Sequence, residues 1–301
     1  MDIETFLVSL YVVVDEWWKR HHPRPSQRVG RPPALTEAEV LTLAILAQWP
    51  RFPSERDFHR FAEAYLRPYF PSLVSQGQLN RRMRALEPEL QALQRYLVTT
   101  LADGSELYRV IDSTLIPAMV RVRACHKGLF AGQAALGRSV SKTEWVYGFK
   151  VGLAVSPAGV VTTFGLAPAN CDERPIGEFL VFSDGHDAYL ADKGFSSVAW
   201  ERRWLKEHGA PVAATPQESA KRAWPEAGRR WAASKRQLIE GVIWQLKEHF
   251  GLERHRAKTL NGLLTRLAAK VAAYTCGQLL NAQLGRPLRL PLGLSNCTSN
   301  V

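Results

Sequence analysis

The chain has 301 residues, of which 46% are hydrophobic and 22% charged, and its formal net charge is +11. This composition excludes a disordered protein and predicts one large globular domain with a smaller one. Residues 201–301 carry 17 lysines and arginines against 7 acids, so the last third holds nearly all of the positive charge. A basic face of this kind favours nucleic acid as a partner, and a basic solubilising surface is the alternative.

The cysteines and the first segment bear on the compartment. Cys125, Cys171, Cys276 and Cys297 form no C-x-x-C pair, which indicates neither a zinc site nor a disulfide framework and favours a reduced, cytoplasmic protein. Residues 1–18 are apolar but interrupted by acids, and they lack a basic start. They therefore predict a buried amphipathic helix, and no membrane segment.

The first hundred residues are predicted to be helical. Leu7, Leu10 and Val14 recur at helical spacing, and a proline-rich basic stretch then ends that helix. Thr36 is a good N-cap, and Glu39 three residues later completes a capping box. Further helices are predicted at residues 55–65, 76–85 and 87–101.

After residue 104 the pattern changes to strands. Segments 108–114, 147–157 and 160–168 are rich in β-branched and aromatic residues, and Pro157-Ala158-Gly159 is a hairpin signal between the last two. The glycine-rich basic segment 123–139, with His126 and Lys127, is predicted to be a loop that touches DNA or simply connects. A helix at 172–182, a strand at 188–192, a helix at 196–208, a strand at 211–215 and a long helix follow.

Asp112 is predicted to end a buried strand, because it follows Arg109, Val110 and Ile111. A carboxylate in that position is costly unless it is paired or binds a metal ion. The alternative is a turn that starts at Asp112-Ser113-Thr114.

Asp192 repeats this arrangement. It ends the short apolar strand at 188–192, and Lys193-Gly194 after it is a turn that lets the backbone approach a ligand closely. Asp184 and Asp187 compete with it, but both are more typical of turns.

Glu240 lies in an amphipathic helical segment, with Arg236 four residues before it and Lys247 seven after, near one face. An ordinary Arg236–Glu240 surface pair is the alternative. Two strand-end aspartates and a helical glutamate are what a two-metal phosphoryl-transfer site needs, and Mg²⁺ prefers carboxylate oxygens. Arg236 and Lys247 would then bind phosphates beside the reacting one.

These residues resemble those of bacterial insertion-sequence transposases, which carry a DDE triad on a ribonuclease-H-like core. Their glutamate helix has a Y-x2-R-x3-E-x6-K signature, which Arg236, Glu240 and Lys247 match, whereas Ala233 stands at the tyrosine position. The resemblance covers roughly residues 105–281. It implies that Asp112, Asp192 and Glu240 are the catalytic residues and bind two Mg²⁺ ions, for which Mn²⁺ can substitute.

The resemblance also implies an α/β fold: a ribonuclease-H-like mixed sheet flanked by helices, after an all-helical domain. Residues 1–104 would bind the DNA ends, 105–285 would be catalytic, and 286–301 would be a tail. The expected activity is cleavage at the terminal inverted repeats of a mobile element and joining of the 3′ ends to target DNA. The expected partners are double-stranded DNA and further copies of the chain.

Two features beyond the triad have open interpretations. The basic residues Arg254, Arg256 and Lys258 are expected to contact phosphates, with a solvated helix start as the alternative. Trp244, one turn after Glu240, either stacks on a flipped base or packs in the core, as tryptophans usually do.

Other functions are weighed against this one. A DNA-binding regulator with structural acids would bind DNA without cutting it, and a catalytically degenerate copy would keep the fold. The sequence has no G-x-S-x-G, H-E-x-x-H or G-x4-G-K motif, which excludes serine hydrolases, zinc proteases and nucleoside triphosphatases of those kinds.

Overall fold

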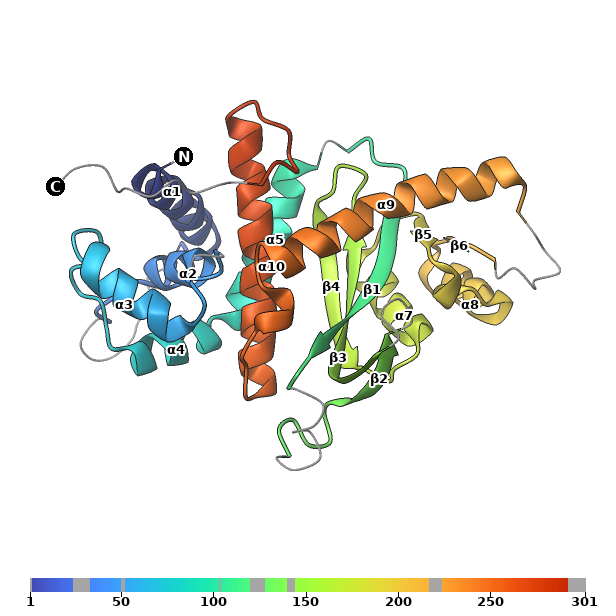
Figure 1. Cartoon of the computed structure of the whole chain (residues 1–301). Coiled ribbons are helices and arrows are strands. Elements are labelled where there is room, and N and C mark those ends of the chain that lie inside the picture. Colours follow the sequence, from blue (N-terminus) through green and yellow to red (C-terminus); the bar gives the residue numbers. More distant parts are fainter. Residues whose placement is uncertain are drawn as a thin grey trace. The chain divides into compact units, whose positions relative to one another are not determined.

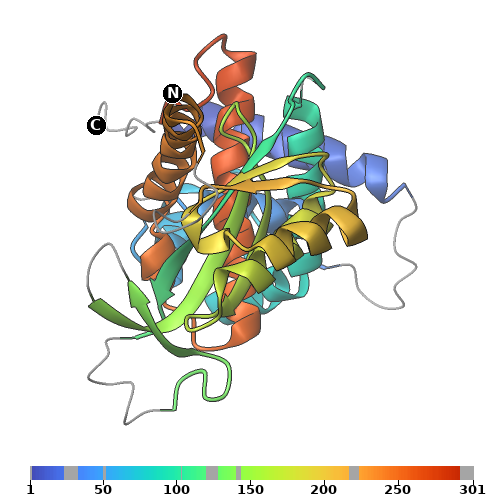
Figure 2. The ribbon, with the colours of Figure 1, turned by 90° about the vertical axis from the view of Figure 1, so that its right-hand side faces the viewer.

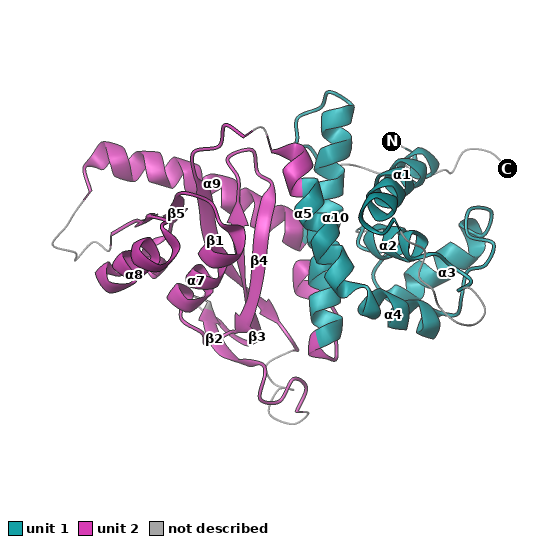
Figure 3. Cartoon of the chain, turned by 180° about the vertical axis from the view of Figure 1, so that it is seen from behind, with its two compact units in different colours: residues 1–97, 248–251, 261–301 teal, residues 98–247, 252–260 magenta. Residues whose placement is uncertain are grey.

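The computed structural model of this chain describes residues 2–23, 33–49, 52–102, 104–119, 128–139, 144–216 and 224–291. His126, Lys127, Cys125, Cys297 and most of the predicted tail lie outside these residues. Two compact units make up the chain (Figure 3): unit 1 is Met1–Leu97, Glu248–Gly251 and Asn261–Val301, and unit 2 is Val98–Lys247 and Leu252–Leu260. The functional ranges 1–104, 105–285 and 286–301 stay a prediction.

Unit 1 is helical, as the periodicity of its sequence predicts. The capping box at the start of the second helix is confirmed, because the Thr36 amide donates to Glu39 Oε2 at 2.5 Å and the Glu39 amide donates to Thr36 Oγ1 at 3.2 Å. The helices are α1 (Ile3–His21), α2 (Glu37–Leu46), α3 (Glu55–Tyr65), α4 (Gln76–Ala85), most of α5 (Glu87–Leu101) and α10 (Leu260–Gln283) (Figure 1).

Helix α10 completes this unit although it lies far away in the sequence. Gln94 Nε2 donates to Thr275 Oγ1 at 2.9 Å, and Arg266 Nη2 lies 2.5 Å from Glu55 Oε1. Lys270 is buried, and its Nζ donates to the Phe250 carbonyl at 2.5 Å, while burial lowers its pKa to about 8. Among the described helices, none is long and apolar enough to cross a membrane.

Unit 2 is built on a mixed sheet, which confirms the predicted fold class. In its described part the strand order is β2-β3-β1-β5-β6, with β4 also paired to β3. Strand β3 runs antiparallel to β1, β2 and β4, and β5 runs parallel to β1 and β6. The strands are β1 (Arg109–Pro117), β2 (Ala135–Ser139), β3 (Glu144–Val155), β4 (Val161–Pro168), β5 (Tyr189–Ala191) and β6 (Val212–Ala214).

Two local predictions about this sheet have different outcomes. The hairpin turn is confirmed: the Gly159 amide donates to the Ser156 carbonyl at 2.8 Å, and Gly159 has a φ of 87°, which glycine adopts readily. The loop predicted for residues 123–139 is wrong at its end, because residues 135–139 form β2. Its backbone pairs with Glu144–Gly148, and this pairing offsets the low strand propensity of its glycine.

Helices cover both faces of the sheet in unit 2. Helices α7 (Glu173–Asp184) and α8 (Val198–His208) lie on one face and α9 (Glu226–Glu248) on the other (Figure 2). Ile111 and Ala191 belong to the apolar core on the α7 and α8 side, together with Leu180 and Trp204. Because side chains alternate along a strand, the residues that follow Ile111 and Ala191 project toward α9.

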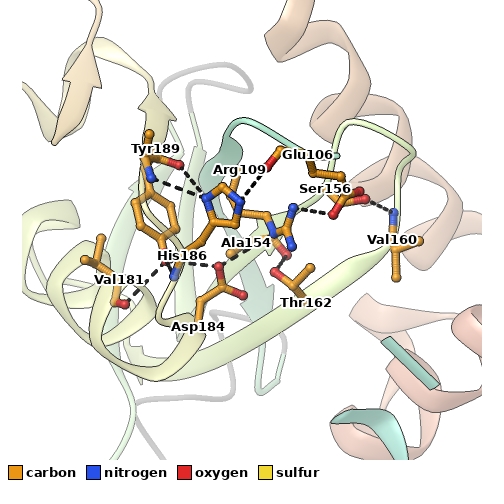
Figure 4. Close-up of polar contacts among 11 residues, drawn as sticks. Glu106, Arg109, Ala154, Ser156, Val160, Thr162, Val181, Asp184, His186 and Tyr189 are labelled. Carbon is orange, nitrogen blue, oxygen red and sulfur yellow. Dashed lines mark hydrogen bonds and ion pairs between the residues drawn. The ribbon is translucent and has the colours of Figure 1, made fainter. Parts of the chain in front are cut away.

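A polar network fixes the starts of β1 and β5 (Figure 4). Tyr189 Oη donates to Asp184 Oδ2 at 3.0 Å and accepts from the His186 amide at 2.8 Å. Arg109 Nη1 lies 2.5 Å from Glu106 Oε2, and its Nε lies 3.8 Å from Asp184 Oδ2. Burial, followed by the charge of Asp184, raises the pKa of Tyr189 well above its usual range. Asp184 therefore has a structural role in this network.

Candidate active site

Asp112 lies inside β1 and not at its end, so the predicted strand end is wrong. The strand continues to Pro117 because Ser113 pairs with Gly152 and Pro117 with Gly148 of β3. The alternative of a turn starting at Asp112 is wrong for the same reason. The parallel pairing of β1 with β5 does end next to Asp112, because the last pair of residues is Ile111 with Ala191.

Asp112 and Asp192 therefore occupy equivalent positions on neighbouring parallel strands, each one residue after the last pair. Adjacent strands lie about 4.8 Å apart, so the two residues are close together on the side that faces α9. Both carboxylates are oriented in the same way. Asp112 Oδ1 accepts from the Ser113 amide at 2.7 Å, and Asp192 Oδ1 accepts from the Lys193 amide at 2.5 Å, where Asp192 caps the short helix η1 (Lys193–Phe195).

Glu240 comes from α9 and is linked to Asp192 through Arg236. Arg236 Nη1 lies 3.1 Å from Asp192 Oδ1, and its Nη2 lies 3.5 Å from Glu240 Oε1. The Arg236–Glu240 pair considered from the sequence is thus present, but Arg236 also contacts Asp192 and so joins the helix to the sheet. The Glu240 side chain is 59% exposed, so its carboxylate stays accessible.

The three acids line one cavity of about 820 Å³ in unit 2. Acidic, basic and exposed aromatic side chains share its walls. Besides the three acids, the charged and aromatic lining residues are Arg138, Glu144, Trp145, Tyr147, Lys150, Glu173, Trp244, Lys247 and Glu253.

The surroundings of Asp112 strongly raise the pKa of its carboxyl group. Burial raises its pKa from 3.8 to about 7. The hydrogen bond from the Ser113 amide and the charge of Arg236 act in the opposite direction, whereas the charges of Glu173 and Asp192 raise the pKa further. A carboxyl group whose surroundings raise its pKa close to neutral pH is typical of functional sites.

Lys247 lines the same cavity, and the basic segment, defined here as residues 254–258, follows the cavity residue Glu253 in the sequence. Lys247 Nζ is 2.7 Å from Glu253 Oε1, and both residues line the cavity. After the short helix η2 (Leu252–Arg254), the Ala257 amide donates to His255 Nδ1 at 3.0 Å. His255 Nε2 therefore carries the proton and donates to the Pro117 carbonyl at 3.0 Å.

This anchoring turns the basic side chains of the segment outward. His255 and Ala257 are buried, whereas Arg254, Arg256 and Lys258 are exposed. Helix α10 begins only at Leu260, after these residues, and the alternative of a solvated segment stays open. Phosphate binding by these three residues stays a prediction.

Several cavity residues were not found from the sequence. Glu173, Lys150 and Arg138 reach the cavity from α7, β3 and β2, and no local pattern marks them. Trp244 is 55% exposed, so its expected place in the core is wrong, and Trp145 is 49% exposed. Exposed tryptophans are uncommon enough to mark a binding surface, but the sequence does not reveal their exposure.

In the described part of the chain, the side chains whose metal-ligating atoms cluster most closely are not the three predicted acids. There, the one group of three such side chains with ligand atoms within 4.8 Å is Glu178, Glu207 and His208, and Arg203 already pairs with both glutamates. The predicted acids do not form such a group, since Arg236 lies between Asp192 and Glu240. Their role as metal ligands and catalytic residues stays a prediction.

Comparison with known proteins identifies the family. The model of the transposase DDE domain matches residues 104–260, which hold the whole described sheet and all three predicted acids. No curated protein matches the chain. The match confirms the predicted resemblance to a DDE transposase, a family of metal-dependent nucleases and transferases that act on DNA and generally use divalent ions. With more than half of its length matched, this chain belongs to the transposase DDE-domain family.

Proposed function

We propose that this protein is the transposase of a bacterial insertion sequence, in which Asp112, Asp192 and Glu240 bind two Mg²⁺ ions. It cleaves at the terminal inverted repeats of the element and joins the 3′ ends to target DNA. The observation that carries the proposal is the equivalent placement of Asp112 and Asp192 after the last pair of β1 and β5, in the same cavity as Glu240.

The donor chemistry fits a hard divalent cation. Carboxylate oxygens are the ligands that Mg²⁺ prefers, and Mn²⁺ accepts the same set. Bound ions would activate the attacking oxygen and stabilise the leaving oxygen of an in-line displacement at phosphorus. Asp112 must be ionised to act as a ligand, and its pKa of about 7 makes that possible at neutral pH.

The remaining side chains would bind and orient DNA. Arg236 holds Asp192 and Glu240 toward one another, and Lys247 contributes a positive charge to the same cavity. Arg254, Arg256 and Lys258 would contact the phosphate backbone, which requires charge and no base reading. Trp244 presents a half-exposed ring in the cavity, and such a ring can stack on an unpaired base.

The assembly follows from the reaction. An element has two ends, and joining both to one target requires at least two active sites held together, so we propose a homo-oligomer on double-stranded DNA. Residues 1–104 would bind the terminal repeats, and the reaction would take place in the bacterial cytoplasm, where the DNA lies.

A cleavage assay tests the proposal. The purified chain is incubated with a labelled duplex that carries the end of its own element, in Mg²⁺, Mn²⁺ or EDTA. Asp112→Asn, Asp192→Asn and Glu240→Gln preserve shape and remove one charge each. Glu226→Gln, on the same helix as Glu240 but paired with Arg230 outside the cavity, is the matched control.

Metal-dependent nicking that disappears in the three variants and persists in Glu226→Gln supports the proposal. Binding without cleavage in every metal supports the regulator, provided that the chain also binds no Mn²⁺. Mn²⁺ binding without cleavage identifies a degenerate copy. Cleavage by any of the three variants at the wild-type rate would show that the triad is wrong.

A further inference from the structure

Glu173 lies at the junction of three elements of unit 2. It is the first residue of α7, and its Oε1 accepts a hydrogen bond from Ser113 Oγ of β1 at 3.2 Å. The same oxygen lies 3.9 Å from Lys150 Nζ of β3. Lys150 in turn donates to the Cys171 carbonyl at 2.7 Å, which fixes the chain that leads into α7.

The other carboxylate oxygen of Glu173 lies against the backbone of Gly194. A Cβ built on Gly194 would be 1.6 Å from Glu173 Oε2 and 2.7 Å from Glu173 Cδ, well inside any allowed contact. The Glu173 carboxylate therefore occupies the place that a side chain at residue 194 would take, and a larger residue there would displace it. This contact lies two residues after Asp192, in the turn whose first amide orients the Asp192 carboxylate.

Glu173 thus contacts a neighbour of each aspartate. Ser113 follows Asp112 in β1 and, because strand side chains alternate, projects to the face of the sheet opposite to that of Asp112. Glu173 accordingly reaches Ser113 from the α7 side, whereas Glu240 comes from α9 on the other face. One carboxylate connects the strand that carries Asp112 to the turn that follows Asp192.

We propose that Glu173 is a positioning residue, which sets the spacing of Asp112 and Asp192 through its contacts with Ser113 and Gly194. The inference rests on the proposed function, because it assigns a role at the same site. A purely structural role is the competing explanation, since an acid in the first turn stabilises a helix. That explanation accounts for a negative charge at residue 173, but not for its contacts with Ser113 and Gly194.

A double-mutant cycle separates the two explanations. Glu173→Ala removes the carboxylate, and Gly194→Ala pushes it away by occupying its place. In the Glu173→Ala background the new methyl group no longer meets that carboxylate. Glu173→Gln keeps an oxygen that accepts from Ser113. Glu201→Gln is the matched control, because Glu201 is also an acid in the first turn of a helix, α8, but lies outside the cavity.

Two quantities are measured for each variant: the Mn²⁺ affinity by calorimetric titration, and the cleavage rate at saturating Mn²⁺. Each alanine variant is expected to lose about 10-fold or more in Mn²⁺ affinity, as changes next to metal ligands typically do. The double variant is expected to match the single ones, because both changes break one contact. The Mn²⁺ affinity of Glu173→Gln should lie between those of wild type and Glu173→Ala, and Glu201→Gln should bind Mn²⁺ like wild type.

Other outcomes overturn the proposal. Wild-type Mn²⁺ affinity in Glu173→Ala, or losses that multiply in the double variant, would show that Glu173 does not act through Gly194. Thermal unfolding is recorded for every variant, and if Glu173→Ala does not fold, Gly194→Ala and Glu173→Gln decide. An equal loss of affinity in Glu201→Gln would show that the effect is the general stabilisation of a helix by an acid in its first turn.

The two proposals can fail separately. If wild type cleaves and Glu173→Ala does so at the same rate and affinity, the positioning role fails and the proposed function stands. Wild type can also bind Mn²⁺ without cleaving DNA, while the double variant loses no more Mn²⁺ affinity than either single variant. In that case the positioning role of Glu173 is supported and the proposed enzymatic function fails. Absence of Mn²⁺ binding in wild type would overturn both.

Discussion

Arg236 Nη1 lies 3.1 Å from Asp192 Oδ1, which connects the middle of α9 directly to the end of β5. The same guanidinium reaches Glu240 one turn further along the helix. One cation therefore compensates two carboxylates and fixes the distance between the helix and the sheet at the cavity. Its planar fork suits this task, which a lysine cannot reproduce with a single ammonium group.

Loss of Arg236 is expected to shift the pH dependence of metal binding. The charge of Arg236 lowers the pKa of Asp112, so Arg236→Gln should move that pKa above its value of about 7. Metal binding requires the ionised carboxylate, so the rise of Mn²⁺ affinity with pH should move to higher pH in the variant. Calorimetric titrations between pH 6 and 8.5 measure this, and an unchanged midpoint would contradict it.

Ionisation of Asp112 is expected to lower the free energy of unfolding as the pH rises toward 7 and above. Its folded-state pKa of about 7 lies above the ordinary value of 3.8, so between these values the native state holds a proton that the unfolded chain has lost. Stability from this group is thus full at low pH and is lost as the pH rises through 7. Asp112→Asn should therefore be more stable than wild type at pH 8, by at most roughly 4 kcal/mol, and gain less at pH 5.

Urea unfolding in EDTA at the two pH values measures this difference. Asp187→Asn is a suitable control, because Asp187 lies outside the cavity and outside the described ion pairs. A stability gain that is the same at both pH values would show that titration of Asp112 is not its cause.

The basic segment is expected to determine how strongly salt weakens DNA binding. Each phosphate contact releases counterions, so replacing Arg254, Arg256 and Lys258 together by glutamine should lower the slope of log affinity against log salt by about 3. The loss should be similar for specific and random duplexes. Arg230→Gln, exposed at the start of α9 and paired with Glu226, is the control in fluorescence anisotropy titrations.

The network around Tyr189 is expected to contribute to stability and not to catalysis. Tyr189→Phe leaves Asp184 and the His186 amide without their shared partner, which should cost roughly 1–3 kcal/mol. The cleavage rate of the folded variant should remain that of wild type, since the network lies at the start of β5 and Asp192 follows its end. A loss of activity without a loss of stability would contradict this role.

Local chemistry in the sequence predicted the features that depend on neighbouring residues. The capping box of Thr36 and Glu39, the turn at Gly159, the helices and the short strand before Asp192 all follow from contacts within a few positions. The mixed sheet also followed, because the order of strands and helices restricts how they can pack.

The features that were missed depend on distant partners. Strand β1 continues past Asp112 because Ser113 meets Gly152, and β2 forms because β3 lies beside it. Glu173 enters the site because α7 begins beside β1 and β3, and Trp244 is exposed because the adjoining space is a cavity. No residue near any of these positions in the sequence carries that information.

The return of α10 to the N-terminal helices determines when unit 1 can fold. Its partners Gln94 and Glu55 are made early, but Thr275 and Arg266 of α10 are made only after unit 2. Unit 2 occupies an almost continuous stretch and can close before then. During translation the sheet can therefore form before α10 is made. A chain arrested shortly before α10 should then expose the apolar faces of α2 and α5 to chaperones.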